Sequence, residues 1–109
     1  MKSLKFAGYL VSPVLSGKKT STWRMFDDKK LQVGDKLAFV NRETGKEFAQ
    51  AEIVGIREKK LSQVVDADFV GHEKANSMQE LYEDFRHFYG DKVTWETPLK
   101  MVDFKLSHG

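Results

Sequence analysis

Short segments in which apolar and polar residues alternate recur along the chain, and this feature constrains the fold most strongly. Such a segment forms a β-strand with two different faces, because successive side chains of a strand point to opposite sides. The sequence predicts strands at residues 3–7, 20–25, 36–40, 48–56 and 98–106. The turn NRETGKE, with Gly45, predicts a hairpin, and Gly55 predicts a β-bulge in the fourth strand.

Two or three short helices are predicted between the strands. The clearest is SMQELYEDFRHFYG, where Ser77 and Glu80 match a capping box and Gly90 ends the helix. Its apolar face is formed by Leu81, Phe85 and Phe88. Shorter helices are expected in YLVSPVLSG, which ends at Gly17, and in KKLSQVVDADF from Ser62 onward. Strands joined by hairpins, with a few helices, predict an α+β fold built on a small β-barrel.

The bulk properties indicate one compact domain over residues 1–109. No apolar run is long enough for a membrane span, so we expect no membrane association. The absence of cysteine excludes disulfides and thiolate metal sites and is typical of a cytoplasmic protein. The net charge is only +2, but residues 1–24 carry five basic residues and no acidic one. One end of the domain is therefore expected to be positive.

The segment GKKTSTWR, residues 17–24, resembles the signature of ASCH domains. That signature has a glycine, any residue, a lysine, two residues, a threonine or glutamate, any residue and an arginine. Gly17, Lys19, Thr22 and Arg24 fit it, and the segments VGDKL (33–37) and FYG (88–90) also resemble the family. The resemblance implies a PUA-like fold: a barrel of five to six mostly antiparallel strands, with two to three short helices beside a cleft.

The same resemblance implies two functions. ASCH domains are thought to bind RNA, and some small members hydrolyse the acetyl amide of N4-acetylcytidine to cytidine and acetate. Those enzymes use a lysine, a threonine and a glutamate, and the first two fall on Lys19 and Thr22 here. Glu73 is the nearest candidate for the glutamate, and Glu80 and Glu83 remain open.

The chemistry of amide hydrolysis restricts how these residues can act. A threonine hydroxyl needs a base, and a lysine serves as a base only when burial or nearby cations lower its pKa. Lys18 and Arg24 are such cations in the sequence. Lys19 and Thr22 are three residues apart and would point to opposite faces of a regular strand, whereas Thr22 and Arg24 share a face. We therefore expect Lys19 in the turn after Gly17, with its long side chain reaching the cleft.

Nucleic-acid binding would use the basic residues differently. Lys18, Lys19 and Arg24 would contact phosphates, and Tyr9 or Phe26 would stack on a base. Purely structural roles are the alternatives: a solvated turn for Lys18 and a surface pair with Asp27 or Asp28 for Arg24. Trp23 is expected in the core with Met25.

Three function hypotheses follow. The first is a monomeric module that recognises RNA or a modified nucleoside, and the second is an N4-acetylcytidine-type amidohydrolase with Thr22 as nucleophile, Lys19 as base and Glu73 assisting. The small net charge favours a small ligand over a long RNA groove. A ribonuclease ranks lower, because no histidine pair lies near the motif. His72, His87 and His108 lack metal-ligand spacing, and no phosphate loop is present, so we expect no metal or cofactor.

Overall fold

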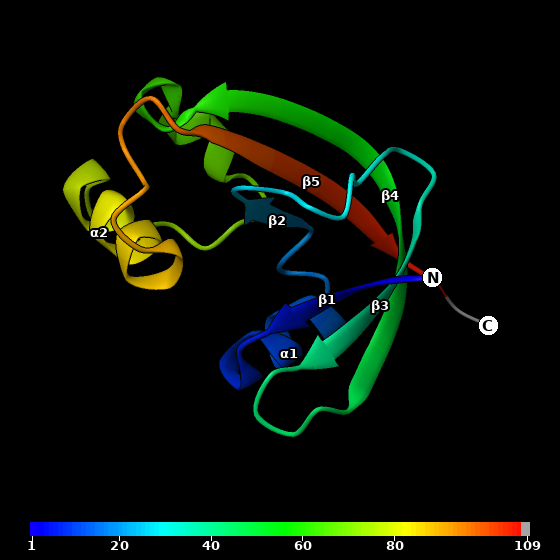
Figure 1. Cartoon of the computed structure of the whole chain (residues 1–109). Coiled ribbons are helices and arrows are strands. Elements are labelled where there is room, and N and C mark those ends of the chain that lie inside the picture. The colour runs from blue at the N-terminus through cyan, green and yellow to red at the C-terminus, as the bar shows by residue number, and fades with distance from the viewer. Residues whose placement is uncertain (108–109) are drawn as a thin grey trace.

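The computed structural model describes residues 1–107, and its five strands form one mixed sheet in the order β1-β3-β4-β5-β2. The strands are β1 (Lys2–Phe6), β2 (Ser21–Arg24), β3 (Lys36–Asn41), β4 (Glu47–Lys60) and β5 (Pro98–Leu106). Strands β1 and β3 pair in parallel, and the other three pairs are antiparallel. Long, curved β4 and β5 bend the sheet into a half-barrel (Figure 1). The predicted α+β fold is confirmed.

Strand β4 runs four residues beyond the predicted end at Ile56. The short helix predicted from Ser62 is wrong: two 3₁₀ turns, η2 (Leu61–Gln63) and η3 (Asp66–Phe69), stand there instead. The backbone is extended at Val64 (φ −68°, ψ 132°) and Val65 (φ −125°, ψ 169°), which ends η2 after one turn. The N–H groups of Leu61 and Ser62 donate to the carbonyls of Thr97 and Trp95. These long-range bonds hold the backbone to the turn before β5. The predicted bulge is confirmed, because the β4–β5 register shifts between Ile53 and Gly55.

The main helix is α2 (Met78–Tyr89), with the predicted ends. The Ser77 hydroxyl accepts a hydrogen bond from the Glu80 N–H at 3.1 Å, and Gly90 ends the helix with φ 90°. The Glu80 carboxylate turns to the Asn76 side-chain amide, at 3.2 Å, so only the serine half of the capping box is seen. Near the N-terminus, η1 (Gly8–Leu10) and α1 (Val11–Leu15) precede a turn at Gly17, whose φ is 83°.

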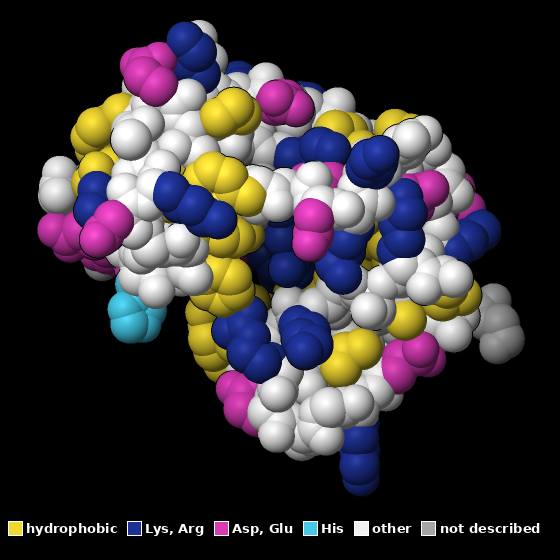
Figure 2. Space-filling model, viewed as in Figure 1, with side chains coloured by type: hydrophobic (Ala, Val, Ile, Leu, Met, Phe, Trp, Pro, Cys, Tyr) yellow, Lys and Arg dark blue, Asp and Glu magenta, His cyan; other side chains and the backbone are white. Residues whose placement is uncertain are grey.

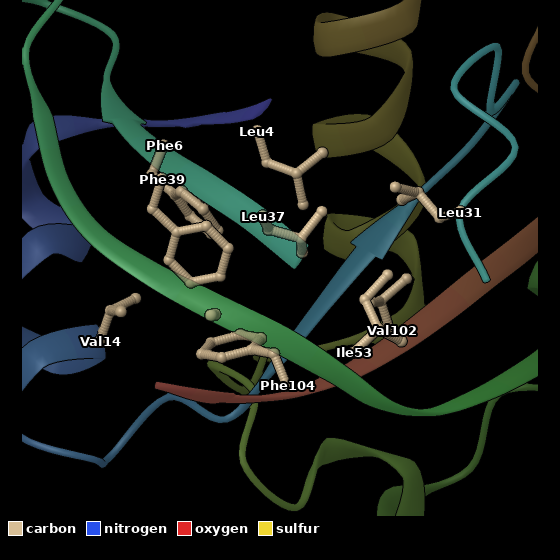
Figure 3. Packing of buried hydrophobic residues seen from close by; sticks show 10 residues of the cluster. Leu4, Phe6, Val14, Leu31, Leu37, Phe39, Ile53, Val102 and Phe104 are labelled. Atoms are coloured by element: carbon tan, nitrogen blue, oxygen red, sulfur yellow. The ribbon is translucent and has the colours of Figure 1, made fainter. Parts of the chain in front are cut away.

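Two hydrophobic clusters occupy opposite faces of the sheet. The first fills the half-barrel, where the side chains of β1, β3, β4 and β5 converge (Figure 3). The second lies beneath α2 and includes Trp23, Met25 and Leu81, as predicted. Phe88 departs from the prediction for the apolar face of α2, because it is 53% exposed. Strand β2 thus packs Trp23 under α2 and turns Thr22 towards the other side.

No helix within residues 1–107 is long and apolar enough to cross a membrane. His108, considered above as a metal ligand, lies outside the described residues.

Candidate active site

A cavity of about 490 Å³ lies between the half-barrel and α2. Its volume falls in the range of small-molecule sites, roughly 300–1,000 Å³. Lys and Arg side chains gather in the hollow between these two parts, with hydrophobic side chains along one border (Figure 2). The wall is built from the end of β1, from β2, from residues 72–75, from α2 and from Arg42. The ASCH-like motif therefore lines a cleft.

Lys19 lies in the irregular segment between Gly17 and β2, so its side chain is freed from the alternation of the strand. Its N–H donates to the Pro13 carbonyl at 3.0 Å, which holds this segment against α1. The Lys19 side chain is only 4% exposed, and its Nζ donates to Glu73 Oε2 at 2.6 Å. Burial lowers the pKa of Lys19, against the opposing effect of Glu73, and the charge of Arg24 lowers it further.

Glu73 is half-exposed and faces Lys19 from the segment before α2. Its partial burial works to raise the pKa of the carboxyl, but neighbouring His72 and the hydrogen bond from Lys19 outweigh that, so the pKa is below its usual value. Of the three glutamates left open, Glu73 is the one that meets Lys19. Glu80 also lines the cavity but bonds Asn76, and Glu83 pairs with Gln79 on α2.

His72 fixes the peptide that carries Glu73. Its ring stacks on Trp23, with centroids 4.0 Å apart and an interplanar angle of 16°. Its Nδ1 lies 2.8 Å from the Glu73 carbonyl oxygen, which makes Nδ1–H the donor. Burial, helped by the charge of Lys19, lowers the pKa of His72 to about 4. His72 is thus neutral near pH 7, and no feature of the sequence singled it out for this role.

Gly71 brings this segment against β2. Its carbonyl accepts from the N–H groups of Thr20 and Ser21 at 2.8 and 3.0 Å. Its φ is +76°, and a Cβ at this position would stand 2.1 Å from Thr20 Oγ1. Only glycine permits both the backbone conformation and the close approach. The segment from Asp68 to Glu73, called the strap below, therefore places Glu73 opposite Lys19.

Thr22 and Arg24 share a face of β2, as the alternation predicted. Thr22 is 4% exposed and lines the cavity. Its Oγ1 accepts a hydrogen bond from Arg24 Nε at 3.2 Å, which leaves the hydroxyl proton free to be donated elsewhere. The guanidinium of Arg24 bonds the Lys5 carbonyl, so the predicted alternative of a surface pair is wrong. Asp27 instead binds Lys100 at 2.7 Å.

The remaining predicted residues lie at different places. Tyr9 is 76% exposed at the rim of the cavity. Lys18 is exposed in the turn and is not part of the wall, and Phe26 borders a separate, smaller hollow. Two residues at the cleft were not predicted as site residues: Arg42, and Phe88, which was expected only on the apolar face of the helix. Arg42 Cζ lies 4.7 Å from the centroid of the Phe88 ring. They come from the β3–β4 hairpin and from α2, and no local pattern connects them.

Among residues 1–107, no three His, Asp or Glu side chains gather closely enough to hold a metal ion. The wall itself is mixed in charge. It carries five basic residues, Lys5, Lys19, Arg24, Arg42 and Lys74, against three acidic ones, Glu73, Glu80 and Asp84.

Known structures provide an independent comparison. An ASCH domain from Lactobacillus crispatus superposes with a TM-score of 0.74 at 18% identity, covering 96% of this chain and 78% of the other. A protein from Enterococcus faecalis gives a TM-score of 0.74 at 16% identity, covering 100% and 84%. The ASCH protein from Zymomonas mobilis gives 0.67 at 10% identity, covering 94% and 65%. The chain has the ASCH-domain fold.

The resemblance to ASCH domains is thereby confirmed at the level of the fold. By sequence, no protein-family model matches the chain, and no curated protein matches it either.

Proposed function

We propose that the cleft binds a nucleoside-sized ligand and hydrolyses an amide on it. N4-acetylated cytidine is the substrate class that the ASCH resemblance implies. The observation that carries the proposal is the buried Lys19 Nζ, 2.6 Å from Glu73 Oε2, in a wall that also contains Thr22. A structural lysine would place its ammonium group in water. This one lies beneath a cavity of about 490 Å³.

The Lys19–Glu73 pair supplies the proton chemistry. At 2.6 Å the two groups can exchange a proton. The resting pair is ionised, because the pKa of Glu73 lies below its usual value, and the burial of Lys19 reduces the cost of forming its neutral amine. In the minor form with the proton on Glu73, Lys19 is a neutral amine that can accept the proton of Thr22 Oγ1. The hydrogen bond from Arg24 to the same oxygen stabilises the negative charge that develops as this proton leaves.

The proposed reaction then proceeds in two stages, acylation of Thr22 and hydrolysis of the acyl-enzyme. Thr22 Oγ1 bonds to the acetyl carbon, and the C–N bond breaks as Glu73 gives its proton to the leaving amine. A water molecule next attacks the acetyl-threonine ester and gives one proton to Glu73, and Lys19 returns a proton to the Thr22 oxygen. Cytidine and acetic acid leave, the acid loses its proton to solvent as acetate, and both residues regain their starting protonation.

The direct test is to follow the release of cytidine from N4-acetylcytidine. We expect turnover by the wild-type chain and a loss of about 100-fold or more in Thr22→Val and in Lys19→Met. Thr44→Val, in the exposed β3–β4 turn, is the matched control and should retain full turnover. Absence of turnover in the folded wild-type chain would contradict the proposal.

A second candidate is RNA recognition without chemistry, which the basic excess along the cleft favours. It predicts binding of single-stranded RNA that weakens steeply with salt, because counterions are released from the phosphates. Steep salt dependence together with no hydrolysis would favour this module over the enzyme.

A further inference from the structure

One wall of the cleft contains three cations that form no ion pair with a carboxylate among the described residues. Among residues 1–107, Lys5, Arg24 and Arg42 take part in none of the ion pairs that the structure forms. All three belong to the half-barrel side, on β1, β2 and the β3–β4 hairpin. Glu80 and Asp84 lie across the cavity on α2. The cleft is therefore polarised, with its basic side facing α2.

The Arg24 guanidinium is held in a fixed orientation. Its Nε donates to Thr22 Oγ1 at 3.2 Å, its Nη2 donates to the Lys5 carbonyl at 3.1 Å, and its Cζ lies 5.2 Å from the Phe6 ring centroid. A guanidinium has five N–H donors, so these two bonds leave three for another acceptor. A partly buried cation with unused donors is costly unless an anion completes it.

Arg42 is held at the mouth of the same wall. Its Cζ stands 4.7 Å from the ring centroid of Phe88, and its backbone N–H donates to the Phe6 carbonyl at 2.8 Å. Burial lowers the pKa of Arg24, Tyr89 and Asp27 act against that effect, and the charge of Arg42 adds to the lowering. Two guanidinium groups held near each other with an exposed lysine form a fork suited to several anionic oxygens.

We propose that Arg24, Arg42 and Lys5 form a phosphate subsite, so that the ligand of the cleft is a nucleotide rather than a neutral nucleoside. The inference rests on the proposed function for the position of the base, which would lie towards Lys19 and Glu73. Phosphate is favoured over a carboxylate because its oxygens can satisfy more than one guanidinium at once. The phosphate comes either from a free 5′-monophosphate or from the backbone of RNA.

The test compares the affinities of the common ribonucleosides with those of their 5′-monophosphates by calorimetry at low salt. We expect the monophosphate of a given base to bind about tenfold tighter or more than the nucleoside, as for a charge-assisted pair. Arg42→Gln and Lys5→Gln should each reduce this ratio severalfold. Lys105→Gln removes an exposed charge of β5 outside the cleft and should leave the ratio unchanged. A short single-stranded cytidine-containing RNA distinguishes the sources: binding tighter than the monophosphate assigns the phosphate to a chain, and equal or weaker binding assigns it to a free nucleotide.

Equal affinities for nucleoside and monophosphate would overturn the subsite. So would a ratio that falls as much in Lys105→Gln as in Arg42→Gln, since general charge would then explain the preference. The binding ratio does not depend on turnover. A preserved ratio without hydrolysis would therefore support the subsite and reject the amidohydrolase, and hydrolysis with a ratio of one would do the reverse.

Discussion

Two charge clusters tie the segment between β4 and α2 to the rest of the molecule, and they differ in how fully their buried charge is satisfied. Asp68 is 3% exposed and accepts from Arg57 Nη1, Lys59 Nζ and the Val65 N–H at 2.7, 2.8 and 2.9 Å. Lys19 is 4% exposed, yet among the described residues its Nζ has one partner, Glu73.

The difference separates structural from functional charge. A carboxylate with three donors is nearly saturated, and these donors lower the pKa of Asp68 to about 2 in spite of its burial. An ammonium group has three donors, and Lys19 uses one towards a protein side chain while its site opens on a cavity. The Lys19–Glu73 cluster, whose hydrogen-bonding capacity is not filled, is therefore the better candidate for binding a ligand or for catalysis.

Removing one lysine from each cluster should separate the two roles most clearly. Lys19→Met should lower turnover by about 100-fold or more, because the base is lost. Lys59→Met should retain turnover and lose about 1 kcal/mol of unfolding free energy, because Asp68 keeps two other donors. Steady-state kinetics and urea unfolding of both variants provide the test. Equal losses of turnover would remove the distinction.

The strap that joins the two clusters is tested by Gly71→Ala. We expect a loss of about 3 kcal/mol, since positive φ and the 2.1 Å approach to Thr20 Oγ1 both oppose a Cβ. Gly34→Ala is the matched control: φ is +94° and nothing lies within 4 Å, so only the backbone term of about 1 kcal/mol remains. Similar unfolding midpoints for both variants would show that the strap does not need the close approach.

The Asp68 cluster predicts a specific pH dependence of stability. The folded-state pKa of about 2 lies below the ordinary value of 3.8, so ionised Asp68 stabilises the fold above about pH 4. That stability is lost as the pH falls from about 4 to 2. Asp68→Asn should cost about 1–2 kcal/mol at neutral pH, allowing for the partly exposed partners. The difference between wild type and variant should shrink over the same window in acid unfolding, and a difference independent of pH would contradict this assignment.

The smallest effect is expected at His72. Phe in its place keeps a ring against Trp23 but loses the hydrogen bond to the Glu73 carbonyl. We expect kcat to fall severalfold with KM unchanged, because Glu73 is less well positioned. Since the pKa of His72 is about 4, the pH profile between 6 and 9 should keep its shape. A profile that loses a limb in His72→Phe would make His72 an acid or base instead.

Local signals in the sequence predicted much of the fold. Ser77 and Gly90 set the ends of α2, Gly45 marks the β3–β4 turn, and Gly55 marks the bulge, because each acts through its own backbone or that of its neighbours. The parallel pairing of β1 with β3 was not predicted. It joins segments more than thirty residues apart, with no turn between them to set the register.

The candidate site likewise combines residues that the sequence predicted with residues that only the fold brings together. The motif singled out Lys19 and Thr22, and proximity to the capped helix favoured Glu73, so these three residues could be predicted from the sequence. Arg42 and Phe88 were not, because they meet only after the hairpin and α2 are placed on either side of the cleft. Two 3₁₀ turns replaced the expected helix at Ser62, where the backbone is extended at Val64 and Val65 and long-range hydrogen bonds hold it to the turn before β5.

In the proposed mechanism, burial, moderated by Glu73, makes the Lys19 amine a usable base. The most direct measurement is the titration of the Lys19 side chain by NMR in the wild-type chain and in Glu73→Gln. We expect a pKa below the ordinary 10.5 in the wild type and a still lower pKa in the variant, since Glu73 stabilises the charged amine. A wild-type pKa at or above 10.5, or a pKa that rises in Glu73→Gln, would contradict the mechanism.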